Sequence, residues 1–206
     1  MFDDKGFDSW ADDYDREVGQ TDKEDRYPFA GYQKILDGII GIVQKKKAAS
    51  ILDVGFGTGT LAAKLYEQGF TIYGQDYSER MIELSKKKMP EAKLYKYDFS
   101  KGLAKPLYEQ KYDFIISTYA LHHLDIEGKI RLIREMMKLL KQEGKILIGD
   151  IAFETTEKMD QCKNMAGDEW DDEENYFVYE EFKKIFTSAT FTPVSFCGAI
   201  LSLKKE

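Results

Sequence analysis

The sequence predicts an α/β protein in which a mostly parallel sheet is covered by helices on both faces. Between residues 50 and 151, short apolar runs alternate with amphipathic segments. The apolar runs are continuous, as in strands that are buried on both faces of a sheet. The chain has 206 residues, of which 43% are hydrophobic, so one domain with a sizeable core is expected.

The central part of the chain predicts five strands and three helices in alternation. The predicted strands are residues 50–55, 70–76, 92–99, 112–119 and 145–151. The predicted helices are residues 58–69, 78–89 and 126–144. Ser78 is a candidate N-cap, Pro90 ends the second of these helices, and Gly69 and Gly144 end the other two.

The two ends of the chain complete the predicted domain. The N-terminal part, residues 1–47, is expected to form a helical lid, with helices around residues 7–14 and 29–46. The cofactor-binding core is placed at residues 48–151. The last part is residues 152–206. Its first segment, residues 152–178, is expected to be an acidic insert without a clear strand, and it is followed by a helix at 178–191 and two closing strands. Those strands, residues 192–197 and 199–205, are expected to be antiparallel across Gly198. No repeat or flexible linker divides this single domain.

Composition excludes several functional classes. The formal net charge of −7 argues against nucleic-acid binding, which needs clustered lysine and arginine. No apolar run approaches the length of a membrane span, so no membrane association is expected. The acidic N-terminus lacks the pattern of a signal peptide, which makes the cytoplasm the expected compartment. Cys162 and Cys197 lack metal-site spacing and are expected to be free thiols.

The segment ILDVGFGTGT, residues 51–60, carries the strongest chemical signal. Gly55, Gly57 and Gly59 follow a buried strand and precede a helix, so that a ligand can approach the main chain closely. A P-loop would need a lysine in this loop, and a dinucleotide site prefers a third glycine where Thr60 stands. Asp53, two residues before the first glycine, suits a ligand with a cationic end. A glycine loop alone is weak evidence, because a tight turn has the same pattern.

Two further acids stand at the ends of the next two strands. Asp76 follows Gly55 by 21 residues, a position from which a carboxylate can accept hydrogen bonds from ribose hydroxyls. Asp98 can accept from an adenine amine, while the neighbouring backbone N–H of Phe99 can donate to the ring. Aspartates also serve as caps and turn residues. Three acids at successive strand ends after a glycine loop nevertheless favour a nucleoside-containing ligand.

The order of these motifs resembles class I S-adenosylmethionine-dependent methyltransferases. The segments are DVGFGTGT, YGQDYSERMIELSKKK, YKYDF, YDFIISTYALHHL and LLKQEGKILIGD. The chain is most similar to the small-molecule type that includes ubiquinone and menaquinone methyltransferases and many uncharacterised bacterial relatives. The N-terminal FDSWADDYDREV resembles the opening of that group. Phe56 departs from the small residue, cysteine or proline that many relatives carry.

This resemblance implies a fold, a cofactor and a set of binding residues. The fold is a Rossmann-like, seven-stranded, mostly parallel sheet with helices on both faces and the last strand antiparallel. The cofactor is S-adenosylmethionine, and its product is S-adenosylhomocysteine. The implied cofactor-binding residues are Tyr14, Asp53, Gly55, Gly57, Gly59, Asp76, Met81, Asp98, Phe99 and Ser117. Of these, Asp76 would hold the ribose, and Met81, Asp98 and Phe99 the adenine. Tyr14 would close over the cofactor.

The implied reaction is in-line transfer of a methyl group to a small-molecule acceptor. It needs the two reactants to be positioned and water to be excluded, and needs a base only if the acceptor must lose a proton. Candidate groups facing the acceptor are Tyr14, Tyr27, Tyr119, His122, His123, Trp170 and Tyr176. For each of the aromatic residues, packing in the core or lid is the favoured role. The acceptor, and whether it is an amine, hydroxyl, thiol or carbon acid, is left open, and so is a homodimer.

The sequence has two histidines, His122 and His123, and they follow the fourth predicted strand. Two ligands are too few for a metal site, and no cysteine is near in sequence, so no metal is expected. Adjacent residues at a helix start point about 100° apart, so only one of them is expected to face the acceptor. His122 is the predicted catalytic residue, and His123 is expected to be structural.

Two other functional classes remain open on the sequence. A nicotinamide-dependent oxidoreductase would share the glycine loop, although Thr60 and Asp53 count against it. A non-catalytic methyltransferase-like subunit would share the fold, although the intact Asp53, Asp76 and Asp98 count against it.

Overall fold

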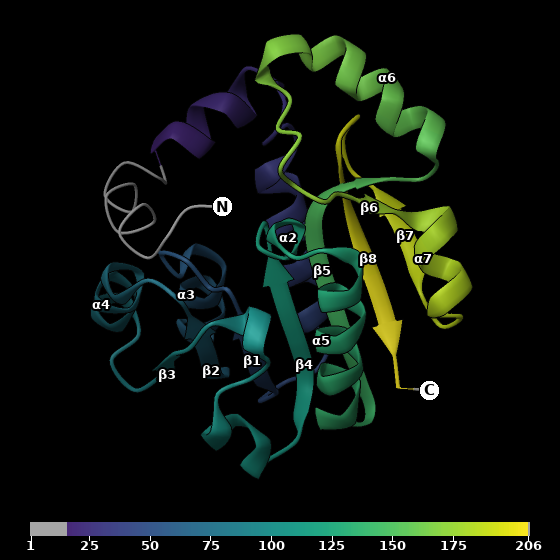
Figure 1. Ribbon diagram of the computed structural model, residues 1–206. Helices are drawn as coiled ribbons and strands as arrows, with labels where there is room; N and C mark the ends of the chain where they lie inside the picture. Colours follow the sequence, from purple (N-terminus) through teal and green to yellow (C-terminus); the bar gives the residue numbers. More distant parts are fainter. Residues whose placement is uncertain (1–15, 206) are drawn as a thin grey trace.

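The computed structural model describes residues 16–205, and its architecture is a sheet with helices on both faces (Figure 1). The strands are β1 (Ser50–Val54), β2 (Thr71–Asp76), β3 (Lys93–Lys96), β4 (Tyr112–Thr118), β5 (Leu140–Phe153), β6 (Phe177–Val178), β7 (Thr190–Pro193) and β8 (Gly198–Lys204). The α-helices with both ends described are α2 (Tyr32–Val43), α3 (Thr60–Tyr66), α4 (Glu79–Lys88), α5 (Ile126–Leu139), α6 (Thr156–Ala166) and α7 (Tyr179–Ile185). Residues 16–23 are also helical.

The predicted fold class is confirmed. The strands pair in the order β3-β2-β1-β4-β5-β8-β7, and β1 to β5 are parallel. β8 is antiparallel to both β5 and β7, as expected for the closing strands. The main path has seven strands, and the short β6 adds an eighth beside β5.

The continuous apolar strands divide their side chains between two cores. Ile51 packs with α2, α3 and α4 on one face of the sheet, whereas its neighbour Leu52 packs with α5 and α7 on the other. This division follows from the alternation of successive side chains across a strand. It explains why the strands read as unbroken apolar runs.

The predicted helix at 126–144 is five residues too long. α5 ends at Leu139, and the backbone becomes extended at Leu140, which pairs with Tyr112 of β4. Leu140 is buried there, and the Lys141 ammonium group contacts Asp113. The tertiary pairing therefore outweighs the helical propensity of this segment.

The C-terminal part differs from the prediction in three places. α6 and the 3₁₀ turn at Gly167–Glu169 occupy a segment that had no predicted helix. α7 ends at Ile185 instead of continuing to residue 191. β7 begins at Thr190 and ends at Pro193, since residues 194 and 195 both donate their N–H groups to the Gly198 carbonyl in a turn.

The upper edge of the sheet, to which β4 points, is covered by residues 16–23 and by α6 (Figure 1). That edge carries the carboxyl ends of the parallel strands, where open α/β sheets bind ligands. Within residues 16–205, no helix has the length and apolar composition to cross a membrane.

Candidate functional site

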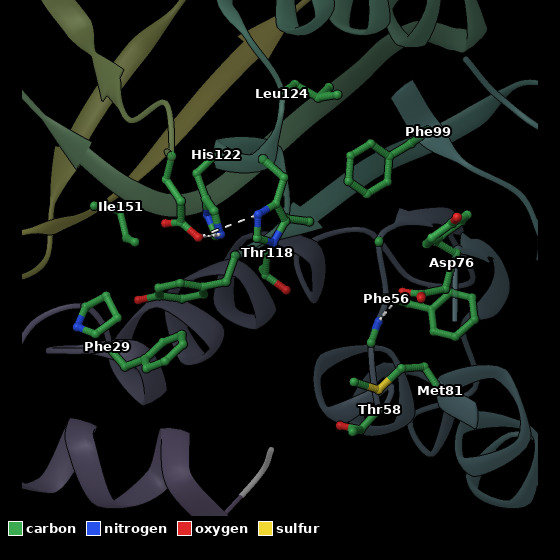
Figure 2. Close-up of a pocket in the computed structure, with 18 of the residues that line it drawn as sticks. Phe29, Phe56, Thr58, Asp76, Met81, Phe99, Thr118, His122, Leu124 and Ile151 are labelled. Carbon is green, nitrogen blue, oxygen red and sulfur yellow. Dashed lines mark hydrogen bonds and ion pairs between the residues drawn. The ribbon is translucent and has the colours of Figure 1, made fainter. Parts of the chain in front are cut away.

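A cavity of about 600 Å³ opens at the carboxyl edge of the sheet, a size typical of small-molecule sites. Its lining includes the glycine loop, the ends of β2 and β4, the two histidines and the loop after α6. In Figure 2 the labelled side chains form two groups. Phe56, Asp76, Met81 and Phe99 surround one end, and Phe29, His122 and Ile151 surround the other.

The glycine loop is held in a conformation that L side chains disfavour. Gly55, Gly57 and Gly59 have φ angles of +74°, +55° and +74°. At Gly55 an added Cβ would lie 2.6 Å from the Ala120 Cβ and 3.3 Å from the Phe99 ring, so no larger residue fits. The loop therefore keeps its backbone open to the cavity.

Asp76 connects β2 to this loop. One carboxylate oxygen accepts from the Gly57 N–H at 2.8 Å, and the other accepts from the Ser78 N–H at 2.9 Å. Each oxygen has a second lone pair. Since Asp76 also lines the cavity, its carboxylate can accept from a ligand while it holds the loop.

Asp98 and Phe99 lie at the same end of the cavity. The Asp98 carboxylate accepts from the Ser100 N–H at 2.9 Å and lies 3.2 Å from the Lys101 ammonium group. Burial raises the pKa of Asp98, but these hydrogen bonds and the lysine charge outweigh it and leave the pKa below its usual value. Asp98 is therefore an ionised acceptor near neutral pH.

Asp53 lies behind the glycine loop with an unsatisfied oxygen. Its side chain is fully buried, and the Oδ1 atom has no hydrogen-bond partner among residues 16–205. Burial, and then the charge of Asp76, raise the pKa of Asp53 to about 8. An orphaned acid of this kind favours a cationic group nearby, such as the α-amino group of a methionine moiety.

His122 is held by a buried aspartate. Its Nδ1 atom lies 2.6 Å from the Asp150 Oδ1, and the other Asp150 oxygen accepts from the Leu121 N–H at 3.1 Å. Burial lowers the pKa of His122, whereas the charge of Asp150 and the hydrogen bond to it raise the pKa. The second effect is larger, so the net shift of the pKa is upward. The Nε2 atom is thereby directed away from Asp150, toward Glu174.

Both histidines line the cavity, contrary to the expectation that only one would. They lie on a 3₁₀ turn, Leu121–His123, and their ring centroids are 4.2 Å apart. Burial, and then the charge of His122, lower the pKa of His123 to about 3, so its ring is neutral. Although adjacent side chains leave the backbone about 100° apart, rotation about their side-chain bonds can bring the two rings together.

The loop between α6 and β6 covers this end of the cavity. We call residues 167–176 the acidic loop. Asn175 donates its N–H to the His122 carbonyl at 2.8 Å, and the Tyr27 and Tyr176 hydroxyl groups are hydrogen-bonded. The Tyr27 ring also stacks on Trp170 at 5.3 Å. The acidic loop is thus fixed both to the histidine turn and to the N-terminal part of the chain.

The sequence-predicted site residues divide into three groups. Those that line the cavity are Gly55, Gly57, Asp76, Met81, Asp98, Phe99 and His122. Those outside the lining are Asp53, Gly59 and Ser117. The Ser117 hydroxyl donates to the Val54 carbonyl at 2.7 Å, and Gly59 packs against Ser85 at the start of α3. Tyr14 lies outside the described residues.

Several cavity residues were not predicted from the sequence. They include Phe29, Tyr32 and Glu174, while Asp150 supports the lining from behind. Asp150 stands near the end of β5 and obeys the same rule that identified the acids after earlier strands. Glu174 has no such signal, since it is one of several acids in an irregular segment.

Known proteins share this sequence pattern and fold. A family model described as a methyltransferase domain matches residues 51–144. An uncharacterized methyltransferase of Alkaliphilus oremlandii is 36% identical over 73% of this chain and 68% of its own length. An uncharacterized methyltransferase of Bacillus subtilis is 32% identical over 90% of this chain and 87% of its own length.

Solved structures show a similar architecture. Magnesium protoporphyrin IX methyltransferase from Synechocystis with bound SAH covers 85% of this chain and 84% of its own, with a TM-score of 0.66 and 20% identity. The DhpI–SAH complex covers 97% of this chain and 93% of its own, with a TM-score of 0.71 and 12% identity. At these identities the likeness concerns the fold.

Proposed function

This chain belongs to the S-adenosylmethionine-dependent methyltransferase family, and from that premise we propose that it transfers a methyl group to a small-molecule acceptor. One observation carries the proposal. A single cavity is bounded by Asp76, Asp98 and Phe99 at one end and by the two histidines at the other (Figure 2). One chamber therefore has room for a nucleoside and for a second molecule beside it.

The residues at the first end fit the cofactor. We assign Asp76 as the acceptor for the ribose hydroxyls and Asp98 as the acceptor for the adenine amine, because both carboxylates line the cavity. Met81 and Phe99 offer apolar surface for the adenine ring. Asp53 lies outside the cavity lining, but a cationic amino end bound nearby would favour the ionised form of Asp53, which would then balance that charge. When bound, S-adenosylmethionine supplies a methyl group on a positively charged sulfur that is already a good leaving group.

The protein's own contribution is to position the acceptor and keep water out. Tyr27, Phe29 and Tyr32 line the cavity with aromatic surface. Asp150 orients the His122 ring, so that Nε2 is available to the acceptor. We therefore propose His122 as the catalytic residue that touches the acceptor.

The charge of the cavity restricts the acceptor. The described residues that line it include five carboxylates and no lysine or arginine. A phosphate-rich polymer would be repelled, whereas a neutral or cationic small molecule would not. The buried free thiols of Cys162 and Cys197 fit a reducing compartment, and we propose that the enzyme acts in the cytoplasm.

Calorimetry with S-adenosylhomocysteine tests the cofactor site. We expect micromolar binding to the wild type and about 10- to 100-fold weaker binding to Asp76→Ala, because one to two hydrogen bonds to a carboxylate are lost. Glu79→Ala, which removes an exposed carboxylate paired with Lys96, is the matched control and should leave the affinity unchanged. Absence of heat at millimolar ligand would contradict the proposed function.

Methyl transfer itself is measured separately. Transfer of labelled methyl groups from S-adenosylmethionine to small molecules of a cell extract would exclude the non-catalytic alternative. Binding of the cofactor product without any transfer would favour it.

A further inference from the structure

We infer that His122, His123 and Glu174 form a binding site for a divalent transition-metal ion such as zinc or iron(II). The site lies in the same cavity, at the end where Figure 2 shows His122 and away from the proposed cofactor end. The inference rests on the proposed function for its catalytic meaning, but the binding of the ion can be measured by itself.

The three side chains converge at metal-ligand spacing. One Glu174 carboxylate oxygen lies 3.5 Å from the His122 Nε2 and 3.6 Å from the His123 Nδ1. All three atoms lie within 4.8 Å of one another. Metal–ligand bonds of about 2.0–2.2 Å in a tetrahedral site put the ligands about 3.3–3.6 Å apart. The two separations are close to that spacing and longer than a good hydrogen bond.

The surroundings of His122 match those of a metal ligand. A metal-binding histidine usually donates its second ring N–H to a carboxylate or carbonyl oxygen, which orients the ring. Asp150 holds the His122 Nδ1 at 2.6 Å, leaving Nε2 toward Glu174. The backbone bond from Asn175 to the His122 carbonyl keeps Glu174 beside the histidine turn.

The local charges also favour a cation. Asp150 and Glu174 bring two carboxylates to the histidine pair. Lys129 brings one ammonium group, which donates a hydrogen bond to the Asn175 carbonyl. If all three groups are ionised, they sum to one negative charge before an ion is bound. A divalent ion would then be partly neutralised by its own surroundings.

The donor set indicates the class of ion. Imidazole nitrogens suit zinc, iron, copper and nickel, whereas magnesium and calcium prefer oxygen ligands. Three protein ligands leave at least one coordination position, as in catalytic metal sites. Because all three ligands line the cavity, that position is available to an oxygen or nitrogen of the methyl acceptor. With an ion bound, the His122 Nε2 would act on the acceptor through the ion and would not contact it directly. Coordination there would lower the pKa of an acceptor O–H or N–H group.

Calorimetry with zinc chloride on the untagged full chain tests the site, and cobalt(II) absorption reports the ligand geometry. We expect one ion per chain. We expect at least tenfold weaker binding by His123→Ala and by Glu174→Gln, and unchanged binding by Glu173→Gln. The last variant makes the same chemical change one residue away, outside the cavity lining. Thermal unfolding and S-adenosylhomocysteine binding show that each variant is folded.

Two outcomes would overturn the inference. One is the absence of saturable zinc binding in a protein that still binds S-adenosylhomocysteine, which leaves the proposed function intact. The other is zinc binding of equal affinity in the wild type, His123→Ala and Glu174→Gln, which would place the ion elsewhere. Loss of S-adenosylhomocysteine binding in the wild type would instead contradict the proposed function.

Discussion

Replacing Asp53 by asparagine removes a carboxyl group whose ionisation the fold opposes. In the folded chain the pKa of Asp53 is raised to about 8, by burial and then by the charge of Asp76. In an unfolded chain an aspartate has a pKa of about 3.9. Between these values the unfolded state has released a proton that the folded state still holds. Asp53 therefore lowers the free energy of unfolding. The decrease is close to zero below pH 4 and grows until about pH 8.

The size of the effect follows from the two pKa values. Each pH unit between them costs about 1.4 kcal/mol, and half-ionisation at pH 8 reduces the last unit. The free energy of unfolding of Asp53→Asn, minus that of the wild type, should therefore rise by about 2 kcal/mol between pH 6 and pH 8. The intrinsic cost of the asparagine side chain is the same at both pH values and cancels.

Urea unfolding followed by tryptophan fluorescence measures this difference at pH values above the pI of about 5.1. Asp113→Asn is the matched control. The pKa of Asp113 is lowered in the folded protein, so Asp113 is ionised in both the folded and the unfolded state from pH 6 to pH 8. A difference for Asp53→Asn that does not change with pH would refute the argument. The same variant should bind S-adenosylhomocysteine more weakly, because it lacks the carboxyl group that is proposed to balance the amino end.

Three further predictions concern other links between structure and function. Burial raises the pKa of Asp113, but its hydrogen bonds to Lys141 and other donors lower the pKa by more, so the net shift is downward. Asp113→Asn should therefore lower the free energy of unfolding at pH 7 by about 1.5–3 kcal/mol, and this loss should shrink as the pH falls below about 4. Acid titration of both proteins by circular dichroism checks the sign, and a loss that grows in acid would contradict it. Gly149→Ala would put a Cβ 2.3 Å from the Cγ2 methyl group of Ile35, so thermal unfolding should show a loss of about 1–3 kcal/mol; if the clash is the cause, the same change should cost less when it is made in Ile35→Ala, which lacks that methyl group. His122→Ala should lower kcat about 100-fold or more while S-adenosylhomocysteine affinity stays within about threefold, and intact turnover would remove His122 from the reaction.

The local part of the site could be predicted from the sequence. The glycine loop, Asp76 and Asp98 each follow a strand, and parallel strands bring such positions to one edge. Ser78 was predicted as a helix cap, and its hydroxyl accepts from the Met81 N–H at 3.1 Å. These features depend on residues that are near one another in the chain.

The limits of helices were harder to predict, because packing decides them. The segment after Leu139 has good helix formers, yet Leu140 extends β5 by pairing with Tyr112. The gain from burying Leu140 and completing the ladder exceeds the small propensity difference per residue. The strand content of residues 190–193 likewise depends on β8 as a partner.

The fold class, the family and the position of Asp76 and Asp98 at one end of the cavity could be predicted from the sequence alone. The tertiary structure alone decided the other end. Glu174 lies about fifty residues beyond the histidines, and the acidic loop brings it to them through Asn175. A count of ligands along the chain therefore predicted no metal, whereas in the folded chain His122, His123 and Glu174 bring potential ligand atoms within 4.8 Å of one another. The physical reason is that a binding site is made by distance in space, and loop closure can join residues that no local pattern connects.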